Sequence, residues 1–312
     1  MEDIKYMVRV SCMTFNQATY IEDAMNGFCM QETNFPFVCT IIDDASTDGE
    51  QDVLKNYIEA HFDLEDSSVV RNEETDDYCL TFAQHKSNKN CYFAVLFLKY
   101  NHYSIRKPKK PYIEEWCDTK YIALCEGDDY WTVSDKLQRQ VDFLESHNDY
   151  SMCFHGANII VDSGKFEESR LHQFDNLETR EYTAEELAKK WIIPTQSMVY
   201  RSTIKAPSDP RFMVGDLILR NQCAVEGKVY CFQEKMSVYR LNAGGMTAKP
   251  FSFEKSMLHT EALIEHFPNV KHIYISILKR HLKSVLFHQP FTALSFLTHN
   301  PHFFKYLFSR AY

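Results

Sequence analysis

Short apolar runs alternate with amphipathic stretches along the first half of the chain. Residues 8–12 and 38–42 are rich in β-branched side chains, which predicts two buried strands. The stretch after the first run places Ile21, Met25 and Phe28 on one helical face, and a similar stretch follows the second run. Strand, helix, strand, helix is the order found in a parallel sheet with crossover helices. The pattern therefore predicts an α/β fold.

The same alternation continues further along the chain. Residues 121–125 form a third apolar run, and a helix is expected from about Ser134. Between these elements, residues 72–118 are polar, then apolar, then rich in Pro and Lys. We expect one or two helices there, followed by a mobile basic loop at 106–111.

The second half of the chain has weaker periodicity. Thr183 opens a capping box, which predicts a short helix with Leu187 and Trp191 buried. Two or three helices are expected after residue 250. We therefore predict a sheet-containing domain over residues 1–250 and a helical extension over 251–312.

Composition narrows the class of protein. The chain has 312 residues, of which 45% are hydrophobic and 25% charged, so it is not a disordered chain. Its net charge of −9 argues against a general nucleic-acid binder, which needs a basic surface. The longest apolar stretch, residues 92–98, is too short to span a bilayer.

Cysteine usage and the first residues favour a reducing compartment. The sequence has 10 Cys residues and no C-x-x-C pair, and several of them lie in apolar runs. The start of the chain has no basic segment followed by an apolar one. We therefore expect a cytoplasmic location.

Polar residues follow all three of the clearest predicted strands. Thr14, Phe15 and Asn16 follow the first strand. Five acids follow the other two, namely Asp43, Asp44, Glu126, Asp128 and Asp129. Ligand sites in open α/β sheets lie at the carboxyl ends of the strands, so these acids are expected to converge.

A cluster of carboxylates raises the pKa of its members unless a cation neutralises it. Hard carboxylate oxygens suit Mg²⁺ or Mn²⁺, which in turn bind phosphates. The acids around Gly127 therefore predict a divalent metal and a diphosphate. The alternative is a polar turn whose acids cap the following helix. Gly127 favours the site, because it permits close backbone approach.

Several common nucleotide and hydrolase motifs are absent from the sequence. It contains no G-x-G-x-x-G, no G-x-x-x-x-G-K-[ST] and no G-x-S-x-G. A Rossmann dinucleotide site, a P-loop and an α/β hydrolase are therefore disfavoured.

Four motifs in a fixed order carry a family resemblance. They are VSCMTFN at 10–16, IIDDASTDG at 41–49, YIALCEGDDYW at 121–131 and KLQRQVDFL at 136–144. Together they resemble family 2 glycosyltransferases of the GT-A fold, of the type that assembles bacterial surface polysaccharides. The resemblance implies a mostly parallel central sheet flanked by helices. It also implies a hexosyltransferase-like enzyme that moves a sugar from a nucleotide-diphosphate sugar to a glycan or lipid-linked acceptor, with inversion.

The resemblance assigns roles to individual residues. The nucleotide-binding residues it implies are Thr14, Phe15, Asn16, Asp43, Asp44, Arg71, Asp128 and Arg240. The metal, Mn²⁺ or Mg²⁺, would be held by Asp128, flanked by Glu126 and Asp129. Glu126 stands where the family often has Asp, and Asn242 stands near the place of a family His.

Two further residues have a functional and a structural interpretation. Asp216 matches the family's general base, which would activate the acceptor hydroxyl. Its alternative is an acid that stabilises the start of a helix. Trp131 would stack on the acceptor sugar or anchor a turn in the core.

Residues 285–312 are aromatic and basic. They resemble an interfacial amphipathic segment, which predicts a peripheral contact at the inner face of the cell membrane. The alternative is a helical cap that packs on the catalytic domain or on a second subunit. For the whole chain, two other functions stay open: a nucleotide-binding regulatory protein without turnover, and a sugar nucleotidyltransferase.

Overall fold

The computed structural model describes residues 6–245 and 251–308, and these form two compact units. The first comprises Met1–Glu181, Ile192–Thr203 and Val229–Ala243, and the second comprises Tyr182–Trp191, Ile204–Lys228 and Gly244–Tyr312. The second unit thus includes Tyr182–Trp191 and Ile204–Lys228, which lie within the region expected to form the sheet-containing domain. The division into a sheet-containing catalytic domain up to residue 250 and a helical extension after it stays a prediction.

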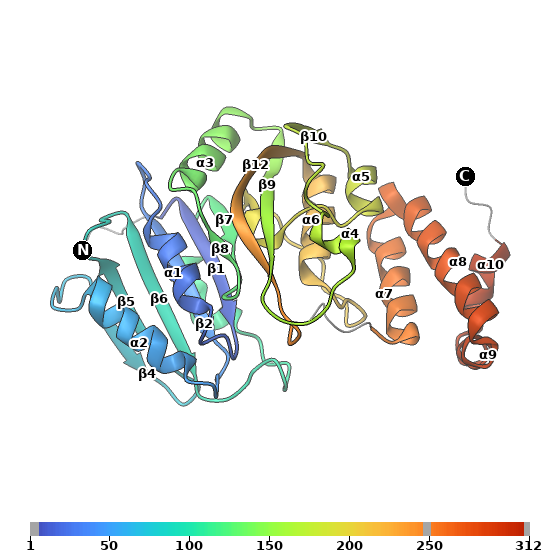
Figure 1. Cartoon of the computed structure of the whole chain (residues 1–312), viewed down its shortest axis with the longest axis horizontal. Coiled ribbons are helices and arrows are strands. Elements are labelled where there is room, and N and C mark those ends of the chain that lie inside the picture. The colour runs from blue at the N-terminus through green and yellow to red at the C-terminus, as the bar shows by residue number, and fades with distance from the viewer. Residues whose placement is uncertain (1–5, 246–250, 309–312) are drawn as a thin grey trace. The chain divides into compact units, whose positions relative to one another are not determined.

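A twelve-stranded mixed sheet forms the centre of the first unit (Figure 1). Its four central strands, in the order β7, β1, β2 and β6, are parallel. They are β7 (Tyr121–Leu124), β1 (Val8–Thr14), β2 (Phe37–Asp43) and β6 (Cys91–Leu98). The predicted α/β fold with a central sheet and C-terminal helices is confirmed.

Antiparallel strands extend both sides of this parallel core. Beyond β6 lie β5 (Tyr78–His85), β4 (Arg71–Glu74) and β3 (Phe62–Asp63). Beyond β7 lie β11 (Val199–Arg201), β9 (Tyr150–Val161), β12 (Lys228–Leu241), β10 (Arg180–Tyr182) and the short β8 (Tyr130–Trp131), which pairs with β12. Ser237 of β12 lies opposite Trp131 of β8. A short helix, α4 (Glu168–Leu171), follows β9.

Helices cover one face of the parallel strands. Helix α1 (Ile21–Cys29) and helix α2 (Glu50–His61) bury their apolar faces against β1, β2 and β6. Helix α3 (Lys136–Ser146) adds Leu137, Val141 and Leu144 to the same core. The periodicity predicted all three helices.

The expectation of helices within residues 72–118 is wrong. This region holds β4, β5 and β6, followed by a 3-10 helix over Lys110–Trp116. Every residue of β6 is buried, because Phe93 and Val95 face the helix-covered core while Tyr92 and Ala94 face a second core that includes Trp116. A strand buried on both faces has no polar positions, so periodicity cannot distinguish it from a buried helix.

The second unit is helical. It contains α5 (Ala184–Lys189), α6 (Gly215–Glu226), α7 (Phe253–His266), α8 (Lys271–His288), α9 (Pro290–His299) and α10 (Phe304–Phe308). The capping box at Thr183 is confirmed, but Trp191 is 37% exposed because α5 ends at Lys189. None of the helices in the described ranges is long and apolar enough to span a bilayer.

Candidate functional site

The turns that follow β1, β2 and β7 meet at one edge of the sheet. The backbone N–H of Asp44 donates to the carbonyl of Thr14 (3.0 Å), and the N–H of Gly127 donates to the carbonyl of Met13 (3.2 Å). The two acidic turns are therefore fastened to either side of the end of β1. The convergence of these strand ends, predicted from sequence, is confirmed.

Gly127 allows this close approach. A Cβ atom at this position would lie 2.6 Å from both the Thr14 hydroxyl and the Gln17 side-chain oxygen. Real Cβ atoms do not come so close to other heavy atoms. Any larger residue would force the side chains of Thr14 and Gln17, or the turn itself, to shift.

Glu50, which sequence analysis missed, joins the first two turns. Its buried carboxylate accepts hydrogen bonds from the Thr14 hydroxyl, the Gln17 backbone N–H (2.9 Å) and the Ser46 hydroxyl (2.7 Å). Burial raises its pKa. The only sequence signal was an acid at the start of α2, and such acids usually stabilise the helix dipole.

Two residues at this edge have left-handed backbone conformations. Asn16 has φ of 54° and Ala45 has φ of 62°. The Asn16 side-chain oxygen accepts the Thr47 backbone N–H at 2.8 Å, which braces the second turn. Positive φ at Ala45 is strained for a residue with a Cβ, and such strain clusters at functional sites. Phe15, between these braced segments, is 45% exposed.

The three acids of the turn after β7, Glu126, Asp128 and Asp129, have different surroundings. A carboxylate oxygen of Asp128 accepts the Asn242 side-chain N–H at 3.3 Å, and Gln17 also hydrogen-bonds this carboxylate. The Asp129 carboxylate is buried and accepts the backbone N–H of Arg240 at 2.8 Å. Glu126 is exposed. Asp129 thus fastens β12 to the turn, and Asp128 contacts Asn242 directly after that strand.

Arg240, which lies on β12, attaches this strand to the acidic turn. Its guanidinium donates to the carbonyl of Asp128 (2.8 Å) and forms an ion pair with Asp23. It also lies over the rings of Tyr20 (5.0 Å) and Tyr130 (4.8 Å). Its side chain is only 8% exposed. Most of its surface therefore contacts other residues, and these contacts hold the site in shape.

Negative charge accumulates at this edge. Burial raises the pKa of Asp43, Asp128 and Asp129, and the charge of Asp128 raises the pKa of Asp129 further. Arg240 already lowers the pKa of Asp128 and Asp129, and a further cation would favour their ionised forms more.

The expected set of three metal ligands is not assembled. Within residues 6–245 and 251–308, no three His, Cys, Asp or Glu side chains are close enough to share a metal ion. Asp128 alone still fits a hard divalent cation, because Mg²⁺ commonly uses one or two carboxylates with water and substrate phosphates. The side-chain amides of Gln17 and Asn242 would orient this ligand.

The cation nearest to Asp44 is Lys109. Its ammonium lies 3.0 Å from the Asp44 carboxylate, which also accepts the backbone N–H groups of His102 (2.7 Å) and Tyr103 (3.0 Å). The loop after β6 thus reaches the same sheet edge. Arg71 does not, because it lies on β4, beyond β5 and β6, and pairs with Glu115 at 2.8 Å.

Trp131 cannot stack on a sugar in this structure. Its side chain is 1% exposed, and its indole N–H donates to the carbonyl of Gln196 at 2.7 Å. The ring packs against Phe28 and lies under the ammonium of Lys136, which is 3.7 Å from the ring centroid. Of the two interpretations from sequence, the structural anchor is the one observed.

Lys136 is a buried cation. It is fully buried, and its Nζ has no hydrogen-bond partner within the described parts of the chain. Burial lowers its pKa to about 7 from 10.5. His155, also buried, has its pKa lowered well below the usual value by burial and then by Lys136. The apolar stem of Lys136 fits the core, but its charge is costly there.

Replacing Lys136 with Met should stabilise the protein at pH 6 to 7 by roughly 1–4 kcal/mol, since Met keeps the chain length and removes the buried charge. Between pH 7 and 10.5 the unfolded lysine binds a proton that the folded one has lost, so this residue makes wild-type stability rise with pH. Urea unfolding across this range should show a flatter profile for K136M. The exposed Lys89→Met is the control, with an expected change within about 0.5 kcal/mol. A K136M variant less stable than wild type at pH 6 would contradict the cost assigned to this charge.

Asp216 lies in the second unit, at the start of α6. One carboxylate oxygen accepts the backbone N–H of Leu217 at 2.7 Å. Arg220, one turn further along the helix, is buried and feels the charge of Asp216. The contact at the helix start fits the structural interpretation, and the role of general base stays a prediction.

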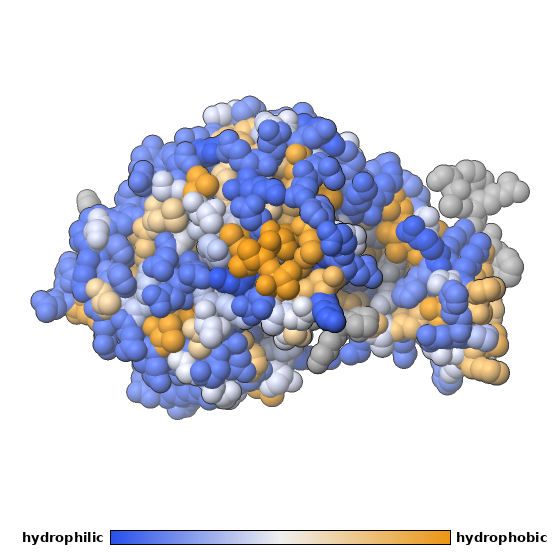
Figure 2. All heavy atoms as spheres, in the orientation of Figure 1, coloured by the Kyte–Doolittle hydropathy of each residue, from blue (hydrophilic) through white to orange (hydrophobic). Residues whose placement is uncertain are grey.

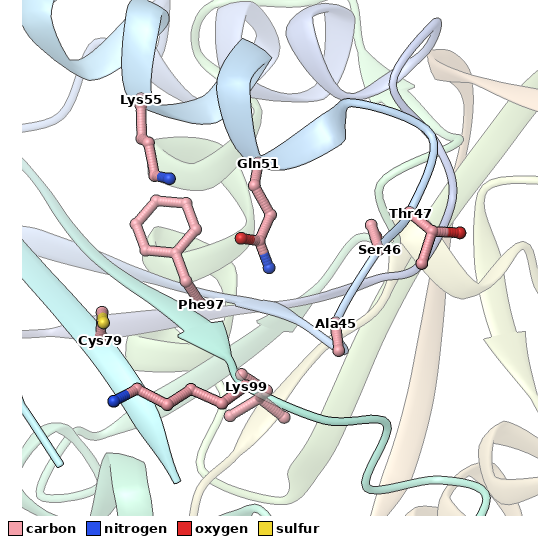
Figure 3. Close-up of a pocket in the computed structure, with 9 residues that line it drawn as sticks. Ala45, Ser46, Thr47, Gln51, Lys55, Cys79, Phe97 and Lys99 are labelled. Atoms are coloured by element: carbon pink, nitrogen blue, oxygen red, sulfur yellow. The ribbon is translucent and has the colours of Figure 1, made fainter. Parts of the chain in front are cut away.

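A pocket of about 460 Å³ adjoins the turn after β2 (Figure 3). Gln51 and Lys55 reach it from α2, and Phe97 reaches it from the end of β6. The ammonium of Lys55 lies 5.4 Å from the centre of the Phe97 ring. No residue that sequence analysis assigned to the site lines this pocket.

The chain shares its fold with known glycosyltransferases. It superposes on S. aureus TarS with a TM-score of 0.52 and 15% identity, over 88% of this chain and 43% of that chain. A shorter TarS, residues 1–349 in complex with UDP, matches over 96% of this chain and 78% of that one, with a TM-score of 0.51. Mannosyltransferase PcManGT from Pyrobaculum calidifontis, in complex with GDP-Man and Mn²⁺, has a TM-score of 0.50 and 12% identity, over 96% and 80% of the two chains. At these identities the likeness concerns the fold.

Relatives by sequence are found in mycobacteria. The uncharacterized proteins Rv1520 of Mycobacterium tuberculosis and Mb1547 of Mycobacterium bovis are each 28% identical over 250 residues, which is 80% of this chain and 62% of theirs. The chain thus spans about three fifths of the length of these relatives. No protein-family model matches the chain.

Proposed function

We propose that this protein is a glycosyltransferase that uses a nucleotide-diphosphate sugar, of the family 2 type. The observation that carries the proposal is the junction of the three turns at the end of β1, where Asp44 and Gly127 are hydrogen-bonded to adjacent backbone carbonyls. This junction places Asp44 and Asp128 at one sheet edge. The glycosyltransferase fold of the structural neighbours and their UDP or GDP-Man ligands support the same conclusion.

Within this proposal, Asp128 holds the donor through its diphosphate. Mn²⁺ or Mg²⁺ bound by Asp128 would supply Lewis-acid neutralisation of the departing nucleoside diphosphate. The amides of Gln17 and Asn242 fix the orientation of the Asp128 carboxylate. Arg240 keeps the turn in place through the Asp128 carbonyl and the Asp129 carboxylate.

The nucleoside would lie along the turns after β1 and β2. The exposed ring of Phe15 offers a stacking surface, whereas Asp44, which we propose accepts a hydrogen bond from base or ribose, is only 4% exposed. In this structure the Asp44 carboxylate is held by the loop around His102 and by Lys109. Lys109, rather than the nucleotide-binding candidate Arg71, is the cation that we propose lies beside the nucleotide.

We propose Asp216 as the general base that removes the proton from the acceptor hydroxyl. Attack by that oxygen on the anomeric carbon forms the new glycosidic bond and breaks the bond to the nucleoside diphosphate. A base and a leaving group on opposite faces of the sugar would invert the anomeric centre. The acceptor is a glycan or a lipid-linked glycan, as in surface-polysaccharide assembly. The transfer reaction would take place in the cytoplasm.

The product released from a nucleotide sugar tests this function. Purified protein with Mn²⁺ should release UDP or GDP from at least one common UDP- or GDP-sugar, and more so with an added glycan acceptor. Donors can first be screened by the rise in melting temperature, because a ligand that binds only the folded state stabilises it. Pyrophosphate release would instead identify a nucleotidyltransferase. Binding without turnover of any donor would identify a regulatory nucleotide-binding protein.

A further inference from the structure

The last 42 residues contain no acidic side chain. Residues 271–312 hold six Lys or Arg and no Asp or Glu, although the whole chain has a net charge of −9. They also hold five His. The described part of this segment forms α8, α9 and α10 in the second unit. A positive segment on an acidic protein favours an anionic partner.

The cations and two aromatic rings share the exposed surface of α8 and the start of α9. Arg280, Lys283 and Phe287 are spaced three, four and seven residues apart, so they lie along one helical face, and all three are exposed. Phe287 is 83% exposed and Phe291, at the start of α9, is 87% exposed. Figure 2 shows hydrophobic residues on the surface around α9. A basic stripe therefore leads to an exposed aromatic corner.

These rings are not needed for packing within the unit. Phe296, Phe303 and Tyr306 are buried, and they form a core with Leu278 and Leu282. Phe287 and Phe291 lie outside this core. The exposed area of these two large apolar rings would be favourably buried by a partner surface.

We propose that the corner formed by Arg280, Lys283, Phe287 and Phe291 docks on the surface of an anionic lipid bilayer. The rings would enter the interface between headgroups and acyl chains, and the cations would lie among the lipid phosphates. A second copy of the chain is the weaker partner, because a symmetric contact would bring two acid-free basic segments together. The idea deepens the proposed function, since a lipid-linked acceptor is presented at such a surface.

Vesicle binding by the full chain tests the proposal without any nucleotide sugar. The protein should co-sediment with vesicles of phosphatidylcholine and phosphatidylglycerol in equal amounts, but not with phosphatidylcholine alone, and added salt should weaken the binding. The double variant F287S/F291S should bind at least about tenfold more weakly. The variant R280Q/K283Q should also lose about tenfold, because each cation near an anionic surface contributes to affinity.

Val225→Ser is the matched control, because Val225 is 49% exposed on α6 of the same unit. It should bind vesicles like wild type. Unchanged binding by F287S/F291S, with a wild-type melting temperature, would overturn the proposal. Dimerisation of wild type in light scattering that F287S/F291S abolishes, with no vesicle binding, would overturn it in favour of a second copy. Nucleoside diphosphate release in solution should be the same in all variants, so failure here is distinct from failure of the proposed function.

Discussion

Replacing Asp128 with Asn is expected to lower kcat/KM for nucleotide-sugar turnover by about 10²–10³-fold, the usual cost of removing one preorganised group that stabilises developing charge. Asn keeps the size of the side chain and can still accept the hydrogen bond from Asn242. It removes the negative charge that would hold a divalent cation. The measurement is initial-rate release of nucleoside diphosphate over a range of Mn²⁺ concentrations.

Asp129→Asn is the matched control for this prediction. The amide oxygen of Asn can accept the Arg240 backbone N–H that Asp129 accepts at 2.8 Å, so the attachment of β12 to the turn is kept. Turnover should stay within a few-fold of wild type. Equal losses in the two variants would show that Asp128 has no special role and that the turn simply tolerates no change.

Replacing Asp216 with Asn should lower kcat by about 10²–10⁴-fold, the range expected when a general base is removed. The amide oxygen of the substituted side chain can still accept the Leu217 backbone N–H, so the start of α6 should be preserved. KM for the donor should change little, because the proposed role concerns the acceptor. Transfer to acceptor and simple donor binding are therefore measured separately.

Glu226→Gln is the control for Asp216, because Glu226 ends the same helix and hydrogen-bonds Gln222 on the surface. It should retain wild-type kcat. If Asp216→Asn also retains it, with a folded α6, then Asp216 only stabilises the start of the helix. That outcome would leave the donor site intact and require another base.

The strand ends were predictable because their signal is local. Each apolar run of a parallel strand stops where polar residues begin, and parallel strands end at the same sheet edge. The positions of Asp44 and Asp128 beside β1 follow from that rule. Their individual environments do not, since Asp129 contacts Arg240 and Asp128 contacts Asn242, each more than 100 residues away in the sequence.

The region between α2 and β7 was not predictable for a physical reason. Residues 92–98 are buried on both faces of the sheet, so the sequence shows no alternation. Without β6 in place, the loop that carries Lys109 to Asp44 could not be located. Arg71, expected from sequence to bind the nucleotide, lies away from this edge, because β4 is separated from β2 by β5 and β6.

Aromatic residues near the acids were equally ambiguous in sequence. Trp131 follows the acidic turn directly, and either a sugar platform or a core anchor has that spacing. Only the burial of the Trp131 ring, which lies under the ammonium of Lys136, decides between the two. At the C-terminus, the sequence could not separate the buried Phe296 and Phe303 from the exposed Phe287 and Phe291, because this depends on how α8 and α9 pack.

Calorimetric titration with UDP and GDP, in Mn²⁺ and then in EDTA, tests the central claim most directly. We expect one of the two nucleotides to bind wild type in Mn²⁺, with binding strongly reduced in EDTA and in Asp128→Asn. Absence of binding by either nucleotide, or equal affinity in wild type and Asp128→Asn, would contradict a metal and diphosphate site at the ends of β1, β2 and β7.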